Sequence, residues 1–151
     1  MWATNRHRPP ATFWMISTAL LVWGLGGATI YIAYFLETPA EFAATAETVA
    51  NREAYAVYVA NIPAWAIAIG IGAAAARLLG AVGLLLRRAW ALPCYLAALV
   101  LFMVAMYRAF VLADVAAVMS GLHVAVEFLF LGLSVFTVVF AHRARSTGIL
   151  T

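Results

Sequence analysis

Charge is scarce in this sequence, and lysine is absent from it. Only 10% of the 151 residues are charged and 67% are hydrophobic, whereas soluble proteins carry about 25% charged residues. This composition predicts an integral membrane protein. The nine basic residues are all arginine and stand in small groups along the chain, so they form no continuous basic patch. We therefore expect no nucleic-acid partner.

Cysteine and catalytic motifs are also nearly absent. Cys94 is the one cysteine and lies in an apolar run, so the chain has no internal disulfide, and we expect this thiol to be a small buried hydrophobic group. The sequence contains no phosphate-binding loop, no nucleophile elbow and no CxxC pair. These absences argue against soluble-type catalysis, and we expect a protein that is not an enzyme.

Long hydrophobic runs are abundant. A helix rises about 1.5 Å per residue and bilayer hydrocarbon is about 30 Å thick, so about 20 apolar residues suffice to cross a membrane. Runs of this length cover residues at about 12–36, 63–86, 89–112 and 121–141. We therefore predict an all-α antiparallel four-helix bundle, a single transmembrane domain over residues 1–151. The first run exceeds the about 7 to 15 residues of a signal peptide's apolar region, which predicts an uncleaved helix.

The segment between the first two runs, residues 37–62, is polar and acidic. It begins with Thr38-Pro39-Ala40-Glu41, which has the form of a capping box with proline at the first helical position. Tyr55 and Tyr58 precede the second run. We predict one short amphipathic helix in this segment, ending at about Asn51 and able to rest on the bilayer or on the bundle.

Arginine is distributed unevenly across the predicted membrane. One side holds Arg6, Arg8, Arg87, Arg88, Arg143 and Arg145. The other side holds five acidic residues and Arg52. The positive-inside rule therefore predicts a multi-pass protein of the bacterial inner membrane, with both termini in the cytoplasm and the acidic segment in the periplasm.

The second predicted span carries a ridge of small residues at every fourth position. Its members are Ala64, Ala68, Gly72, Ala76 and Gly80. On a helix these positions form a nearly straight groove that another backbone can approach closely, so we expect a helix of this chain or of a partner to pack there. Arg77 lies inside the same span, where a charge costs at least about 2.5 kcal/mol, and we expect it to find a partner, water or the interface.

Three further ionisable side chains, Arg108, His123 and Glu127, lie in the outer half of the predicted membrane. Counted at about 1.5 Å per residue from the cytoplasmic ends, Glu127 lies about 22 Å deep and the other two about 28 Å deep. Two interpretations stay open. The cluster is either a polar site in which Glu127 takes a proton or binds a cation and His123 relays the proton, or a structural Arg108–Glu127 ion pair between two spans.

These residues are too few to predict a metal or a haem. His123 has no histidine partner at its depth, because His7 and His142 lie outside the spans, and a haem site would need a second axial ligand. His123 and Glu127 supply only two ligands, whereas zinc usually takes three or four from the protein. We expect no metal and no cofactor.

Short motifs spread over most of the chain carry a family resemblance. They are Phe13-Trp14, Asn51 with Tyr55, Pro63-Ala64-Trp65, Leu78-Leu79-Gly80 and Leu84-Leu85-Leu86-Arg87-Arg88. With them the chain resembles an uncharacterised family of small four-span bacterial inner-membrane proteins, common in alphaproteobacteria and often automatically labelled "sugar transporter". The resemblance implies no catalytic residues. Arg77 stands where the family pattern has a glycine, so the resemblance assigns it no role.

Two functions are compatible with this sequence. The first is a non-catalytic accessory or structural subunit that docks its small-residue ridge on a larger membrane complex. The alternative is a small oligomeric transporter of a polar solute or of protons that works around Arg108, His123 and Glu127. The first is favoured, because four spans with few polar groups offer little from which to build a pathway. The expected partners are membrane lipids and other membrane subunits or further copies of the chain.

Overall fold

The computed structural model describes residues 9–45 and 49–151, which contain four long and two short α-helices and a 3-10 turn at Val115–Ala117. The long helices are α1 (Ala11–Leu36), α4 (Ala64–Leu85), α5 (Ala91–Tyr107) and α6 (Gly121–Ser146). The short helices are α2 (Pro39–Thr45) and α3 (Arg52–Ala60). With the π-helical turn Arg108–Leu112 added to α5, each long helix is long and apolar enough to cross a membrane. The predicted all-α bundle is confirmed, and its helices are those of a small multi-pass membrane protein.

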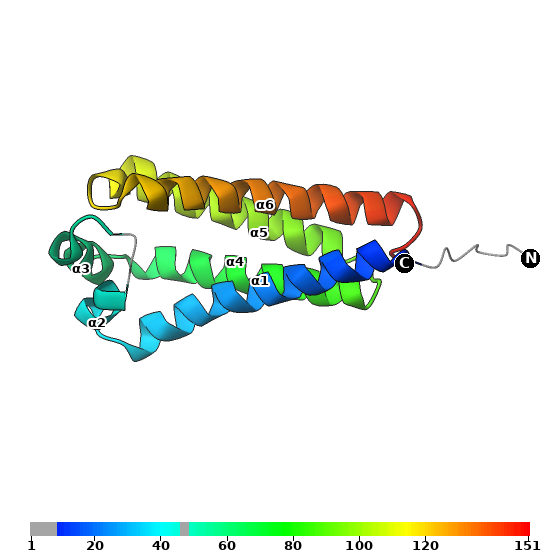
Figure 1. Cartoon of the computed structure of the whole chain (residues 1–151), viewed down its shortest axis with the longest axis horizontal. Helices are drawn as coiled ribbons and strands as arrows, with labels where there is room; N and C mark the ends of the chain where they lie inside the picture. Colours follow the sequence, from blue (N-terminus) through cyan, green and yellow to red (C-terminus); the bar gives the residue numbers. More distant parts are fainter. Residues whose placement is uncertain (1–8, 46–48) are drawn as a thin grey trace, which may run out of the picture.

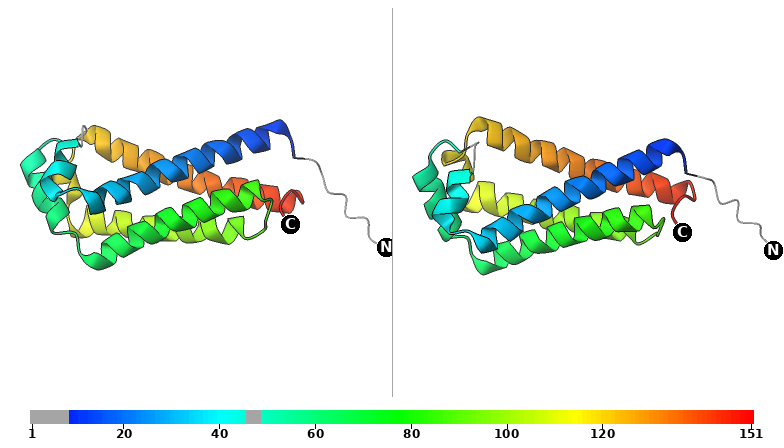
Figure 2. Two further views of the ribbon diagram at one scale, coloured as in Figure 1. Left: turned by 90° about the horizontal axis from the view of Figure 1, so that it is seen from below. Right: turned by 60° about the horizontal axis from the view of Figure 1, so that its bottom comes forward.

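The two ends of the bundle differ. The start of α1, the α4–α5 turn and the end of α6 lie at one end, called the terminal end below (Figure 1). The short helices α2 and α3 and the α5–α6 connection lie at the other end, called the loop end. Helix α4 packs against α1 and α5, and α5 packs against α6. Helix α1 runs obliquely past α6 (Figure 2).

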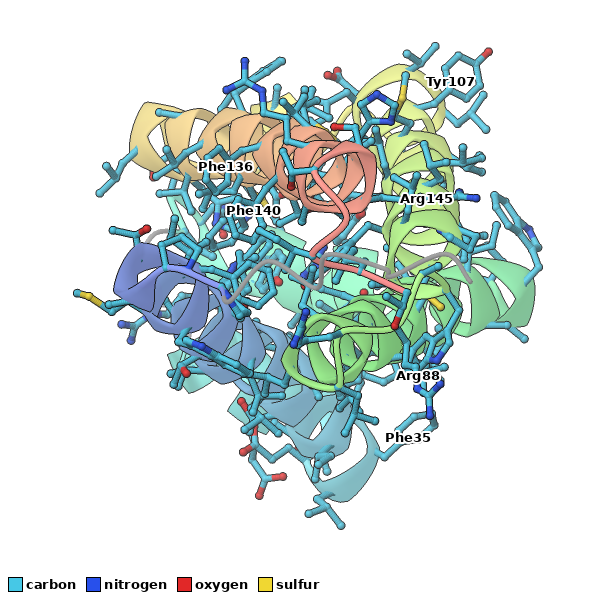
Figure 3. The ribbon with its side chains drawn as sticks, turned by 90° about the vertical axis from the view of Figure 1, so that its right-hand side faces the viewer. Phe35, Arg88, Tyr107, Phe136, Phe140 and Arg145 are labelled. Atoms are coloured by element: carbon cyan, nitrogen blue, oxygen red, sulfur yellow. The ribbon has the colours of Figure 1, made fainter. Side chains whose placement is uncertain are left out.

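Close packing fills the terminal end. Leu84 and Ala91 are fully buried there, and Phe13 of α1 stacks on Phe140 of α6 with ring centroids 5.7 Å apart. Figure 3 views the bundle from this end and shows Phe136 and Phe140 on the side of α6 that faces α1. These contacts tie the first long helix to the last.

The turn between α4 and α5 is built from the arginine pair. The N–H of Arg88 donates to the C=O of Gly83 (2.8 Å) and that of Arg87 to the C=O of Leu84 (2.9 Å), the two bonds of a Schellman motif. Arg87 has a φ of 56°, in the left-handed region that usually favours glycine. Its Nε donates to the C=O of Ile149 at 3.1 Å. The residues that mark a membrane boundary in the sequence therefore also fasten the chain that follows α6.

The segment between α1 and α4 differs from its prediction. The capping box is confirmed, because the carboxylate of Glu41 accepts hydrogen bonds from the N–H (2.8 Å) and hydroxyl (2.7 Å) of Thr38. The single helix predicted to end at about Asn51 is wrong: α2 is described as far as Thr45, positions 46–48 lie outside the described residues, and Asn51 is the N-cap of a second helix, α3. Its side chain accepts from the N–H of Ala54 at 3.1 Å, since asparagine is a strong N-cap.

The third span ends at its predicted residue, whereas the last span extends beyond its predicted end. The π-helical turn ends at Leu112, and Asp114 reverses the chain with a φ of 43°. Helix α6 begins after Ser120, whose hydroxyl accepts from the N–H of His123 at 3.3 Å. It continues past the predicted end near Ala141 to Ser146, with two arginines in its last turn, where cations interact favourably with the helix dipole.

Candidate functional site

A cavity of about 340 Å³ lies at the loop end of the bundle. All six helices contribute side chains to its wall, as does the π-helical turn after α5. Small-molecule sites in proteins occupy about 300–1,000 Å³. The cavity is therefore large enough for a small ligand.

Most of the cavity wall is apolar or aromatic. Its aromatic members are Tyr31, Tyr34, Phe42, Tyr55, Tyr58, Phe102, Phe110 and Phe130. Tyr34 of α1 and Phe42 of α2 pack edge to face with centroids 5.9 Å apart, and Tyr55 and Tyr58 of α3 stack at 6.0 Å. The short helices thus place their aromatic side chains over the loop end of the cavity.

Arg108 is the most deeply buried charged residue of the cavity wall, with 9% of its surface exposed. Its Nη1 donates to the phenol oxygen of Tyr58 at 2.7 Å, and its guanidinium carbon lies 5.0 Å from the centroid of the same ring. Within the described residues no carboxylate lies at ion-pair distance from it. Arg108 begins the π-helical turn, a local feature that often accompanies functional sites.

His123 and Glu127 lie on one face of α6, one turn apart. Their Nε2 and Oε1 atoms are 3.5 Å apart, and the two side chains are 23% and 30% exposed. The three residues of the predicted cluster therefore line one cavity. The direct Arg108–Glu127 ion pair, however, is not formed: in the part of the chain that is described, Arg108 bonds to Tyr58 and Glu127 pairs with His123. Helix α3, which is not predicted from the sequence, supplies the phenol that Arg108 contacts.

The two tyrosines of α3 are site residues that the sequence analysis did not identify. Burial raises the pKa of Tyr55 to about 12. Burial also raises the pKa of Tyr58, although the charge of Arg108 opposes that shift. Both phenols are neutral at physiological pH, as ordinary tyrosines are, and are able to donate a hydrogen bond. The available signal was Asn51, a strong N-cap shortly before the first of them.

Arg77 lies outside the cavity wall and finds an aromatic partner. Its guanidinium carbon is 4.3 Å from the ring centroid of Trp23 on α1 and 5.8 Å from that of Phe102 on α5. A cation over an aromatic face gains about 0.5 to 2 kcal/mol, with the larger values at desolvated sites. This contact offsets part of the cost of placing the arginine within a span.

The small-residue ridge of α4 has different surroundings along its length. Its members are Ala64, Ala68, Gly72, Ala76 and Gly80. A Cβ atom on Gly72 would lie 3.3 Å from a methyl group of Leu101, and one on Gly80 would lie 3.0 Å from the ring of Tyr95, both on α5. The first alanine is exposed, and the second and third are at least partly accessible. Helix α5 thus covers the ridge at both of its glycines.

Other close approaches lie off this ridge. A Cβ atom on Gly83 would lie 3.0 Å from the Cα of Ala91. One on Gly70 would collide with the phenol of Tyr31. The regular four-residue spacing predicted one packing face, whereas α4 uses additional glycines to approach α1 and the start of α5.

The cavity presents a small number of polar groups on a mainly apolar wall. It presents one guanidinium, one imidazole–carboxylate pair and several phenols on an apolar wall. Among the described residues no three His, Cys, Asp or Glu side chains gather as a set able to hold a metal ion. Groups of the kinds present can orient a ligand through hydrogen bonds and charge.

Comparison with known proteins gives no relative from which a function could be inferred: no family model, no curated protein and no solved structure matches the chain.

Proposed function

We propose that this protein binds a small, largely apolar molecule in the loop-end cavity and performs no covalent chemistry on it. The observation that carries the proposal is a cavity of about 340 Å³ whose wall is mainly aromatic and aliphatic, with a few polar groups among them. Apolar walls with a small number of placed polar groups are the usual composition of ligand pockets.

The closed terminal end supports binding in preference to transport. A transporter exposes its site alternately to both sides, commonly through broken helices near mid-depth. Here the half of the bundle beyond the cavity is filled by buried side chains such as Leu84, Ala91 and Tyr95. The π-helical turn, the one such irregularity within the described spans, lies at the loop end.

The accessory-subunit function remains a prediction. The surroundings of the ridge support it less than the sequence pattern of the ridge did. Gly72 and Gly80 face α5 of the same chain, so they offer no free groove to a partner. The alanines of the ridge are exposed or partly exposed. The cavity therefore carries the proposal and the ridge does not.

We further propose that the cavity lies in the outer half of a bacterial inner membrane. The uneven distribution of arginine supports cytoplasmic termini. The start of α1 and the end of α6 lie together at the terminal end (Figure 1), as this orientation requires. The family resemblance carried by the sequence motifs favours the same location.

The experiment is to purify the protein from its native membrane in mild detergent and to identify small molecules that remain bound, by mass spectrometry. Ala105 lines the cavity, whereas Ala97 lies on the exposed surface of the same helix. Ala105→Phe should remove the bound molecule and Ala97→Phe should retain it. A parent protein that carries no small molecule, or the same molecules in both variants, would contradict the proposal. Subunits that copurify stoichiometrically with an empty cavity would favour the accessory function instead.

A further inference from the structure

The charge balance of the cavity indicates what kind of group its ligand carries. Glu127 pairs with His123 at 3.5 Å, and both side chains are partly exposed. Arg108 is 9% exposed and, within the described residues, faces no carboxylate at ion-pair distance. A desolvated charge without an opposite charge is costly, so the least compensated group in the cavity is a cation.

The hydrogen-bonding capacity of Arg108 and Tyr58 is also incompletely used. A guanidinium has five N–H donors, and in the described structure Arg108 uses one of them on a side chain, the phenol of Tyr58. Because that phenol oxygen accepts from Arg108, its own O–H remains able to donate. The two residues therefore present several donors to the same region of the cavity, and the described side chains form no further hydrogen bond with these donors.

We propose that Arg108 and Tyr58 bind the acid group of a lipophilic anion, a carboxylate or a phosphate ester, whose apolar body lies against the aromatic wall. This inference rests on the proposed function and adds the chemical class of the ligand. Arginine binds carboxylates and phosphates through paired, charge-assisted hydrogen bonds. The body of the ligand contacts side chains such as Tyr55, Phe102 and Phe130.

The size of the cavity limits the ligand further. Its volume of about 340 Å³ is at the small end of the range for ligand pockets. A single-chain or aromatic acid fits such a volume as a whole. A diacyl phospholipid could enter only by its headgroup, so the acid group comes either from a free organic acid or from an anionic lipid.

The test compares an acid with its neutral analogue. The protein is placed in nanodiscs of phosphatidylcholine, and the binding of phenylbutyrate and of phenylbutyramide is measured by equilibrium dialysis. The acid should bind at least about tenfold more tightly than the amide, because a hydrogen bond to a charged group contributes about 1.5–3 kcal/mol and 1.4 kcal/mol is a factor of ten. Arg108→Gln should abolish this preference, and Tyr58→Phe should reduce it by about threefold or more.

Matched controls separate the site from general charge and folding effects. Arg88 and Tyr107 lie outside the cavity wall, and Figure 3 shows both side chains pointing away from the bundle. Arg88→Gln and Tyr107→Phe should bind the acid as the parent does. Amide binding that persists in Arg108→Gln would show that this variant is folded.

The outcomes distinguish this inference from the proposed function. Equal binding of acid and amide, abolished for both by Ala105→Phe, would overturn the inference and leave the proposed function standing. Undiminished acid binding in Arg108→Gln would overturn it as well. If neither probe binds and no molecule copurifies with the parent, both proposals fail.

A second arm identifies the source of the acid group. Part of the phosphatidylcholine is replaced by phosphatidylglycerol, which carries an anionic phosphate ester. Displacement of phenylbutyrate in the parent, with no such effect on residual binding in Arg108→Gln, would place a lipid headgroup at the site. If phosphatidylglycerol does not change the binding of phenylbutyrate, the site is assigned to a free organic acid.

Discussion

Tyr58 connects the charged and the aromatic parts of the cavity. Its phenol oxygen accepts a hydrogen bond from Arg108 at 2.7 Å, and its ring stacks on Tyr55 with centroids 6.0 Å apart. The side chain at this one position therefore contributes both to the position of the guanidinium and to the packing of α3. Tyr58→Phe removes the first contact and preserves most of the second.

The Arg108–Tyr58 hydrogen bond should appear as an energetic coupling. In a double-mutant cycle of Arg108→Gln and Tyr58→Phe, we expect a coupling of about 1–3 kcal/mol in the free energy of unfolding, because the bond involves a charged and buried donor. The cycle of Arg108→Gln with Glu127→Gln should give a smaller coupling, since these two residues have separate partners. Reversible denaturation in mild detergent measures both. A larger coupling in the second cycle would indicate that Arg108 and Glu127 form an ion pair.

The buried phenol of Tyr55 should make stability fall at high pH. Burial raises its pKa from 10.0 to about 12, so the folded state holds the proton more tightly than the unfolded state does. The stability this provides is complete below about pH 10 and is lost as the pH rises through about 12. We expect the unfolding temperature of the parent to fall more steeply in this window than that of Tyr55→Phe. Identical slopes would contradict burial of this phenol.

At the scale of elements, α4 and α5 form the most closely packed pair. A Cβ atom on Gly80 would lie 3.0 Å from the ring of Tyr95, which is 1% exposed. In lipid there is little hydrophobic drive between helices, so small residues that permit close approach are the main source of such pairing. The sequence predicted this property of α4 and left open which helix uses it.

Bulk at the α4–α5 contact should therefore destabilise the fold itself. We expect Gly80→Leu to reduce the folded fraction or lower the unfolding temperature sharply, because overpacking a well-filled contact costs about 1–3 kcal/mol or more. A Cβ atom on Gly132 of α6 would meet no atom within 4 Å, so Gly132→Leu is the matched control and should fold as the parent does. Size-exclusion profiles and thermal unfolding measure both. A Gly80→Leu variant with parental stability would show that α5 does not occupy the ridge.

The sequence predicted the long helices well because their signal is strong. Twenty or more apolar residues bounded by prolines or arginines leave few alternatives, and α4 begins and ends within a residue or two of its predicted limits. Helix α3 was not predicted. Its nine residues, which include Tyr55 and Tyr58, are on average neither strongly apolar nor strongly polar, so they resemble a connecting loop. The cavity depends on α3, so it could not be predicted without it. Depth counting brought Arg108, His123 and Glu127 together, but hydrogen-bond partners depend on side-chain geometry that spacing does not encode.

For the whole molecule, the orientation in the membrane is the property that most affects the proposal. The arginine distribution predicts cytoplasmic termini, which would place the cavity toward the periplasm. Alkaline phosphatase fused after Thr45 should therefore be active, and a fluorescent protein fused at Thr151 should be fluorescent in the cytoplasm. An inactive phosphatase together with a dark terminal fusion would invert the orientation and move the cavity to the cytoplasmic side.

The contact between Arg77 and Trp23 has a consequence for how the chain enters the bilayer. Helix α1 precedes α4 in the sequence, so during synthesis the Trp23 ring reaches the membrane before the arginine that stacks on it at 4.3 Å. An isolated arginine at mid-span costs at least about 2.5 kcal/mol to insert, and the ring returns up to about 2 kcal/mol. We therefore predict that helix α1 aids the insertion of α4, a later segment of the same chain. In translation with microsomes or inverted vesicles, Trp23→Leu should lower the fraction of chains with α4 inserted, whereas Trp14→Leu should not.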